Sequence, residues 1–275
     1  YSLYASARES FDGYDASIST PGAKFRRNGL KQFCRPTDIT YTLDNIEGLV
    51  KNEGYPLEHL WLTHEVQTIN LPVPETPAEG DPQPDDIVVR ATIPLQRVCN
   101  NIHVDIVRGS NISPAALATG ASTKAYHITT DDYEAWIGTP DGRHELDLGA
   151  NTTAGAVPLN FIPHSIAPAE TDKNEPCLRA EFTTSRLFYD NTTPDDMLYI
   201  RNLQSGKIFQ FDLPQLLAKD IDRYTNRGWS EQEYLDREYD FNFKVVFNEE
   251  GDEWQYIDIF INMLSWSKRV QNVNL

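Results

Sequence analysis

The chain has 275 residues, 40% of them hydrophobic and 11% aromatic, and a formal net charge of −17. This length and composition exclude a disordered chain and allow one large or two ordinary domains with a buried core. The negative charge argues against nucleic acid as a partner and against binding to anionic lipid, because a polyanion repels phosphate groups.

Cysteine usage and the N-terminus give two further expectations. Cys34, Cys99 and Cys177 are irregularly spaced and include no CxxC pair, so they form no disulfide framework. One bridge with a free thiol and three buried thiols both remain open. The chain begins at Tyr1 within an extended pattern, and no charged and apolar leader precedes it. We therefore expect the natural N-terminus, with any targeting signal, to lie upstream.

The first third of the sequence contains short extended segments and one acidic, proline-rich loop. Strands are expected at 39–43 and 59–71, with 42–52 as a candidate short helix and 71–86 as the loop. Period-two alternation then predicts a strand over 87–95 and a longer one over 98–107, with Pro94 as a bulge or edge position between them. One face of the longer strand carries Val98, Asn100, Ile102, Val104 and Ile106.

A small polar stretch at 109–123 follows, and there we place a domain boundary that divides the chain into 1–108 and 109–275. Beyond it, short strands separated by turn residues are expected at 124–129, 133–138, 144–149, 178–189, 197–202 and 207–213. The chain then closes with a hairpin, in which 241–247 and 257–263 carry apolar stripes around the loop 248–253, and with a last extended segment at 266–275.

Helix signals are few and short. Pro214 stands in the first turn of a candidate helix at 213–224, and Ser230 with Glu233 forms a candidate capping box for 230–238. Neither segment has the character of a crossover helix between parallel strands, so antiparallel sheets are expected. About a dozen short strands with turns predict a mostly β chain built as sandwiches or barrels, with a few short helices.

The search for catalytic and metal-binding patterns nominates no residue. Cys99 and His103 share a strand face but would lie about 13 Å apart, too far for one ion. Among the 41 acidic residues, none stands in a calcium-loop frame, and the sequence has no GxSxG elbow or phosphate-binding loop. We therefore predict no catalytic residue, no metal, no cofactor and no enzymatic activity, although a glycoside hydrolase with two converging carboxylates stays as a remote alternative.

Exposed tryptophans could stack on sugars. Trp136, Trp229 and Trp254 are the candidates for such a platform, and the competing interpretation places each of them in the core. A surface module that binds glycans is therefore kept as the alternative function.

Three blocks of the sequence resemble, in the right order, the Bacteroidales fimbrillin-associated anchor family. The block 87–106 carries a valine-rich strand, a Leu-x-Arg motif at 95–97 and an Ile-x-Val strand. The block 182–219 carries Ser-Arg-Leu at 185–187, two short strands and the helix motif DLPQLL. The block 233–275 carries Leu-Asp-Arg at 235–237, a hairpin, a tryptophan and a terminal Val-x-Leu. Residues 1–86 fit the family loosely.

The resemblance implies two transthyretin-like sandwich domains in a subunit that anchors a fimbrium at the outer membrane. Its partners would then be other fimbrial subunits, which assemble by adding an extended segment of one chain to the sheet of another. Such an anchor would fill its own groove and join the polymer by a different surface. Family members begin with a lipoprotein signal and an acylated cysteine, which this chain lacks, so lipid attachment is an implication only.

The terminal segment 266–275 is the expected partner contact under this interpretation. Its apolar side chains are Trp266, Val270, Val273 and Leu275, which could fill pockets on another subunit. The alternative is an internal edge strand of its own domain, and both remain open.

Overall fold

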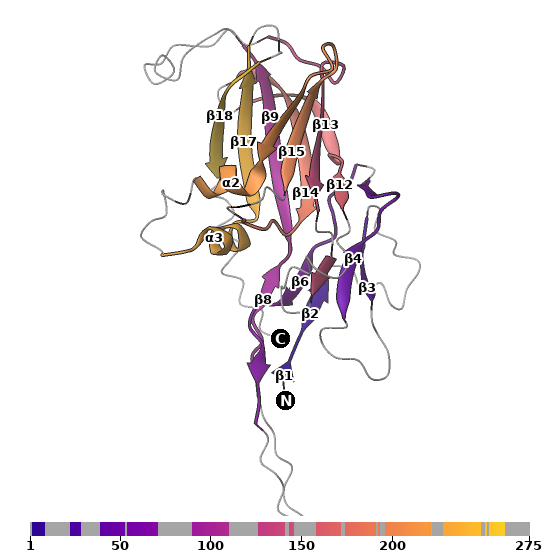
Figure 1. The fold of residues 1–275 in the computed structure, drawn as a ribbon, viewed down its shortest axis with the longest axis vertical. Helices are drawn as coiled ribbons and strands as arrows, with labels where there is room; N and C mark the ends of the chain where they lie inside the picture. Colours follow the sequence, from indigo (N-terminus) through magenta and orange to yellow (C-terminus); the bar gives the residue numbers. More distant parts are fainter. Residues whose placement is uncertain are drawn as a thin grey trace, which may run out of the picture.

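Strands dominate the described part of the chain in the computed structural model (Figure 1). The structure describes residues 2–8, 23–28, 39–52, 54–70, 90–109, 126–140, 143–145, 158–171, 174–190, 192, 196–219, 221, 228–248, 251 and 253–261. The predicted mostly β fold with short helices is therefore confirmed, while its transthyretin-like character stays a prediction.

Two five-stranded sheets form a sandwich that makes up the upper part of Figure 1. The first sheet has the order β13 (Ser165–Glu170), β14 (Pro176–Ser185), β9 (Cys99–Arg108), β17 (Asp240–Phe247) and β18 (Trp254–Ile261). The second has the order β16 (Ile208–Asp212), β15 (Met197–Asn202), β10 (Tyr133–Thr139), β12 (Leu159–Phe161) and β5 (Leu49–Val50).

The core between these sheets follows from period-two alternation along the strands. On β9, Ile102, Val104 and Ile106 are fully buried, as the sequence predicts. Aromatic rings close the interior across the two sheets, because Tyr133 of β10 stacks on Phe247 of β17 with ring centroids 5.2 Å apart.

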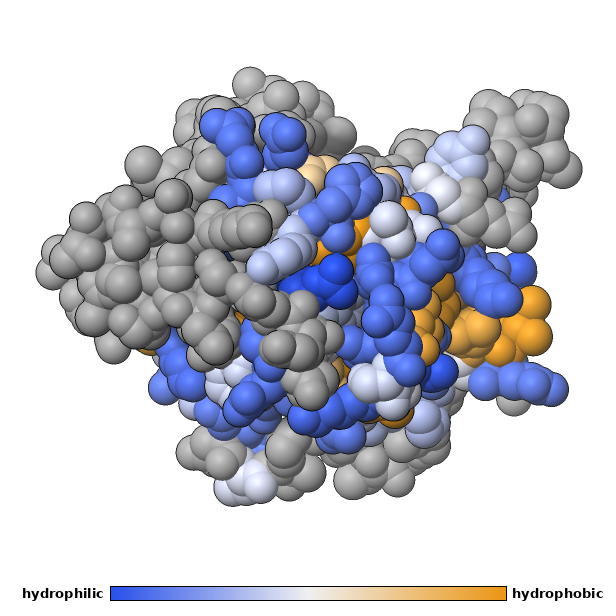
Figure 2. Space-filling model, turned by 90° about the horizontal axis from the view of Figure 1, so that it is seen from above, coloured by the Kyte–Doolittle hydropathy of each residue, from blue (hydrophilic) through white to orange (hydrophobic). Residues whose placement is uncertain are grey.

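Smaller sheets lie below the sandwich in Figure 1. They are β11 (Arg143–Glu145) with β4 (Thr40–Leu43) and β3 (Phe25–Asn28), β2 (Ser6–Arg8) with β6 (Leu60–Thr63) and β8 (Leu95–Arg97), and β1 (Ser2–Leu3) with β7 (Gln67–Thr68). From above, in Figure 2, the described surface is largely hydrophilic, with apolar residues in separate patches.

Two strand pairs are parallel, although the sequence predicts only antiparallel pairs. The pairs β17–β9 and β12–β5 are parallel, and every other described pair is antiparallel. Strands β9 and β17 are far apart in the chain, so no hairpin turn forces them into opposite directions.

The strand pairings cross the proposed boundary between 1–108 and 109–275 at three places. Strand β9 lies between β14 and β17, β5 joins β12, and β11 joins β4. The division into two domains stays a proposal, and these pairings show that any such domains share strands across it.

Both short helices begin where the sequence predicts, and each has a capping side chain. Helix α2 (Leu213–Ala218) starts after Asp212, whose carboxylate accepts the Gln215 N–H at 3.0 Å. Helix α3 (Glu231–Arg237) starts after Ser230, whose hydroxyl accepts the Glu233 N–H at 3.2 Å. No helix among the described residues is long and apolar enough to cross a membrane.

Several local predictions are wrong. The segment 42–52 holds no helix, because Glu47 (φ 53°) and Gly48 (φ 81°) form a tight turn into β5. Of the expected strand 87–95, the described residues 90–94 are irregular, and β8 begins only at Leu95. The described residues 126–129 of the expected strand 124–129 are also irregular, and the Tyr126 N–H there donates to the Arg108 carbonyl of β9 at 2.8 Å.

Candidate functional site at the junction of the three motif blocks

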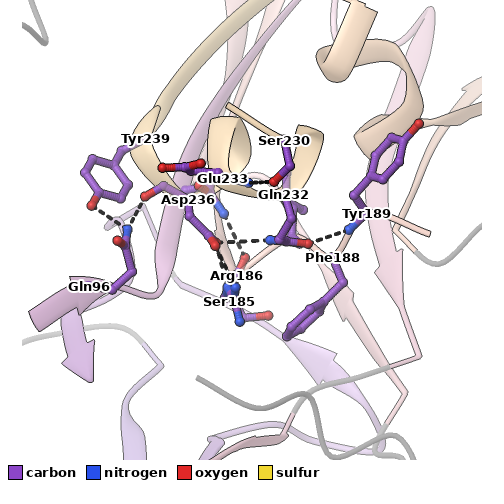
Figure 3. Close-up of polar contacts among 12 residues, drawn as sticks. Gln96, Ser185, Arg186, Phe188, Tyr189, Ser230, Gln232, Glu233, Asp236 and Tyr239 are labelled. Carbon is purple, nitrogen blue, oxygen red and sulfur yellow. Dashed lines mark hydrogen bonds and ion pairs between the residues drawn. The ribbon is translucent and has the colours of Figure 1, made fainter. Parts of the chain in front are cut away.

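A buried ion pair joins the end of strand β14 to helix α3 (Figure 3). The Arg186 guanidinium donates from Nε to Oδ1 of Asp236 and from Nη2 to Oδ2, both at 2.6 Å. The side chains of Arg186 and Asp236 are only 11% and 10% exposed. Such a two-pronged pair is stronger than a surface pair, and removal of either partner would leave a buried charge.

Gln232 extends this contact along α3, one turn before Asp236. Its Nε2 donates to Oδ1 of Asp236 at 3.0 Å and to the carbonyl of Leu187 at 3.1 Å. Its Oε1 accepts the N–H of Tyr189 at 2.8 Å. One amide side chain therefore satisfies backbone groups of an irregular segment that would otherwise lack partners in the protein interior.

Strand β8 is fastened to the C-terminal end of the same helix. Gln96 donates from Nε2 to the Asp236 carbonyl and to the Tyr239 hydroxyl, the latter at 2.7 Å. The Arg97 guanidinium lies over the Tyr239 ring, 5.1 Å from its centroid. These contacts connect the small sheet β2–β6–β8 to the base of the sandwich.

Asp196 fastens the irregular segment after β14 to the second sheet. This residue is 2% exposed, and its carboxylate accepts the N–H of Phe188 at 3.0 Å. Its backbone carbonyl accepts the N–H of Leu213, the first residue of α2, at 3.0 Å. Both helices and both sheets therefore meet around residues 186–190.

The side chains of Gln96, Arg97, Arg186, Gln232 and Asp236 are called the junction below. Each of the three sequence blocks contributes to it: Leu-x-Arg supplies Gln96 and Arg97, Ser-Arg-Leu supplies Arg186, and Leu-Asp-Arg supplies Asp236. The sequence identifies these motifs but did not lead to a prediction that they contact one another. The available signal was a single arginine and a single aspartate, each set in a short segment of buried apolar neighbours.

The junction holds strand β8, the end of strand β14 and helix α3 together. The Arg186 guanidinium and the Asp236 carboxylate bind each other, and among the described residues no three His, Cys, Asp or Glu side chains could hold a metal ion. Its chemistry is that of a rigid polar joint between sheets.

The terminal candidates cannot be placed in this arrangement. Trp266, Val270, Val273 and Leu275 lie outside the described residues, so their partner role stays a prediction.

The three candidate tryptophans occupy separate elements, and no described ring contact joins any two of them. Trp136 stacks on Tyr199 at 5.1 Å with the Arg201 guanidinium 5.5 Å from its ring centroid. Trp229 lies under Arg237, and Trp254 meets Phe211 edge-on at 5.9 Å. Only Trp254 is strongly exposed, at 48%. The described contacts therefore give each ring its own protein partner instead of one shared platform.

Two of the three cysteines are buried free thiols, and Cys34 lies outside the described residues. Burial, with a smaller contribution from the nearby Asp105 carboxylate, raises the pKa of the Cys177 thiol to about 12. The Asp105 carboxylate binds both Nε and Nη2 of Arg179, at 2.7 and 2.9 Å, and this hydrogen bonding raises the pKa of Arg179. Cys177 is therefore an unreactive buried residue near the Arg179–Asp105 ion pair.

Comparison with known proteins places these observations in one family. The family described as fimbrillin-A associated anchor proteins Mfa1 and Mfa2 matches residues 37–272, which include every junction residue. No curated protein matches the chain.

Solved structures share the fold at low sequence identity. A candidate adhesin from Bacteroides ovatus is 18% identical with a TM-score of 0.61, and the match covers 90% of this chain and 71% of that one. A candidate adhesin from Bacteroides thetaiotaomicron is 17% identical with a TM-score of 0.59, over 86% and 70%. The fimbrial anchor protein Mfa2 from Porphyromonas gingivalis is 15% identical with a TM-score of 0.53, over 94% and 75%.

Proposed function

The chain belongs to the family of fimbrillin-A associated anchor proteins, and from this membership we propose that it tethers and assembles fimbriae at the outer membrane. The observation that carries the proposal is the family match over residues 37–272, since it spans the first two motif blocks, the third block up to residue 272, and every junction residue. The role proposed is structural and non-enzymatic.

The partners proposed are other fimbrial subunits, and attachment to the membrane would use an N-terminal lipid. Within the chain, the segment 266–275 with Trp266, Val270, Val273 and Leu275 is the proposed contact to a neighbouring subunit. A terminal extended segment supports this role because its backbone can extend a partner's sheet while alternate side chains select the partner.

The junction supports a subunit that bears force. A tethering subunit has to transmit a pulling force from one of its surfaces to another without separation of the parts that join them. Here the small sheet β2–β6–β8, α3 and the sandwich are joined by charge-assisted and amide hydrogen bonds with little solvent exposure. Such bonds hold a fixed geometry better than apolar contacts alone, because hydrogen bonds are directional.

The direct test is binding to purified stalk fimbrillin from the same source. The proposal expects a saturable complex that survives size-exclusion chromatography, and expects a chain truncated after Ser265 to lose affinity while keeping its melting temperature. Absence of any complex with the stalk and accessory subunits of that fimbria would contradict the proposal.

A glycan-binding adhesin is the second candidate, favoured by the 48% exposure of Trp254 and by the likeness to two candidate adhesins. A glycan array separates the two functions. Saturable glycan binding that is lost in Trp254→Ala, and kept in Trp229→Ala, would support the adhesin.

A further inference from the structure

Strand β16 is an edge whose outer backbone groups have no partner in the described chain. It pairs with β15 on one side only. The Asn202 N–H donates to the Lys207 carbonyl at 2.9 Å, and the Leu213 N–H donates to the Asp196 carbonyl at 3.0 Å. Because bonded and non-bonded pairs alternate in an antiparallel ladder, the N–H and C=O groups of Ile208 and Gln210 point away from β15.

Apolar side chains surround this edge. Among the described residues, Leu203, Ile208 and Trp254 are 42%, 46% and 48% exposed, and they stand on the turn before β16, on β16 itself and at the start of β18. Trp254 touches Phe211 of β16 edge-on at 5.9 Å, so the edges of the two facing sheets meet here. Residues 203 and 208 on one sheet and 254 on the other, with the edge of β16, are called the flank below.

One other edge of the sandwich is guarded against an added strand. Strand β13, at the edge of the first sheet, carries Pro168 in its middle, and proline has no N–H to offer. Strand β16 has neither a proline nor a charged residue between Lys207 and Asp212, and its sequence there is Ile-Phe-Gln-Phe. An unguarded edge with exposed apolar neighbours is what a natural protein retains where another chain is meant to pair.

We propose that the flank receives an extended segment of a fimbrial partner subunit, which adds a strand beside β16. Only an extended backbone offers donors and acceptors at the spacing of the Ile208 and Gln210 groups. Side chains of the incoming segment that face inward would lie against Phe209, Phe211 and Trp254 and would be apolar, whereas the residue opposite Gln210 would be polar. The identity of the partner rests on the proposed function, and the position of the edge does not.

The test uses the full chain and purified stalk fimbrillin, with dissociation constants from surface plasmon resonance. Gln210→Pro removes one outward N–H and leaves the ladder to β15 intact, because position 210 does not bond to β15. Gln210→Thr keeps the N–H and is the matched control. Ile208→Asp places a charge on the flank. We expect about tenfold weaker binding for Gln210→Pro and Ile208→Asp, with Gln210→Thr within about twofold of the unchanged chain.

The outcomes distinguish a failure of the flank as the docking site from a failure of the proposed fimbrial role. Equal binding of stalk fimbrillin by all four chains would overturn the flank as the docking site while leaving the fimbrial role intact. No binding by the unchanged chain would overturn both. A change confined to self-association, measured by analytical ultracentrifugation, would assign the flank to a second copy of this chain and overturn the proposed occupant. All four chains should keep the same melting temperature within a few degrees.

Discussion

The junction, at the base of the sandwich, and the flank, at one of its edges, differ in how their polar groups find hydrogen-bond partners. At the junction, the side chains of Arg186, Gln232 and Asp236 satisfy one another and the backbone of residues 187 and 189. At the flank, backbone groups of Ile208 and Gln210 face outward between half-exposed apolar side chains. A satisfied polar network fixes geometry, and an unsatisfied edge offers binding. This contrast assigns structural support to the junction and partner recognition to the flank.

The largest effect is expected from breaking the junction. Asp236→Ala leaves the Arg186 guanidinium buried without its carboxylate, which should lower the free energy of unfolding by about 3–5 kcal/mol. Urea unfolding followed by circular dichroism measures the change. The exposed pair Arg237–Glu233 gives the matched control, and Glu233→Ala should cost about 0.5 kcal/mol or less. Similar losses in the two variants would contradict a special role for the junction.

The second effect concerns the β17–β18 loop, which is fastened to the opposite sheet near the flank. The Gly251 carbonyl accepts from the Tyr133 hydroxyl at 3.2 Å and from Nδ2 of Asn202 at 2.8 Å. Gly251 has φ 73°, and an added Cβ would collide with the Tyr133 hydroxyl. Gly251→Ala should therefore lower the free energy of unfolding by about 3 kcal/mol.

Gly206→Ala is the control for Gly251→Ala, since Gly206 has the same φ of 73° but no atom within 4 Å of an added Cβ. It should cost only the backbone strain of about 1 kcal/mol. Thermal melts of the two variants report the difference. A loss for Gly206→Ala as large as that for Gly251→Ala would show that the fastening of the loop to the opposite sheet is unimportant.

A smaller effect is expected where β8 meets α3. Gln96→Ala removes hydrogen bonds to the Asp236 carbonyl and the Tyr239 hydroxyl, and should cost about 1–2 kcal/mol. The amides of α3 should then exchange with deuterium faster than in the unchanged chain, while those of β9 keep their rates, because the helix loses its attachment to β8. An unchanged exchange rate in α3 would mean that β8 does not hold the helix.

The smallest effect on stability is expected at the flank. Ile208→Thr replaces a 46% exposed side chain by another β-branched residue and should change the free energy of unfolding by about 0.5 kcal/mol or less. Urea denaturation measures it beside Ile200→Thr, a fully buried position on the neighbouring strand, which should cost several times more. A large loss in Ile208→Thr would indicate that the flank is part of the core.

Local sequence patterns predicted the individual strands and helices but not which of them contact one another. The faces of β9, the β17–β18 hairpin and the start of α3 followed from periodicity and capping, which depend on residues close in sequence. The pairing of Arg186 with Asp236 spans 50 residues, and with 24 basic and 41 acidic residues no local rule selects that pair. The parallel partner of β9 was missed for the same reason. The free edge of β16 also depends on which strands do not pair, and a single strand's sequence carries no record of that.

Amide hydrogen exchange, resolved by residue, compares the two regions most directly in the chain alone and in its complex with stalk fimbrillin. The Tyr189 amide, bound to Gln232 at the junction, should be protected in both states. The amides of Ile208 and Gln210 should exchange rapidly in the free chain and become protected in the complex. Protection of these two amides in the free chain, or rapid exchange of them in a stable complex, would contradict the assignment of recognition to the flank.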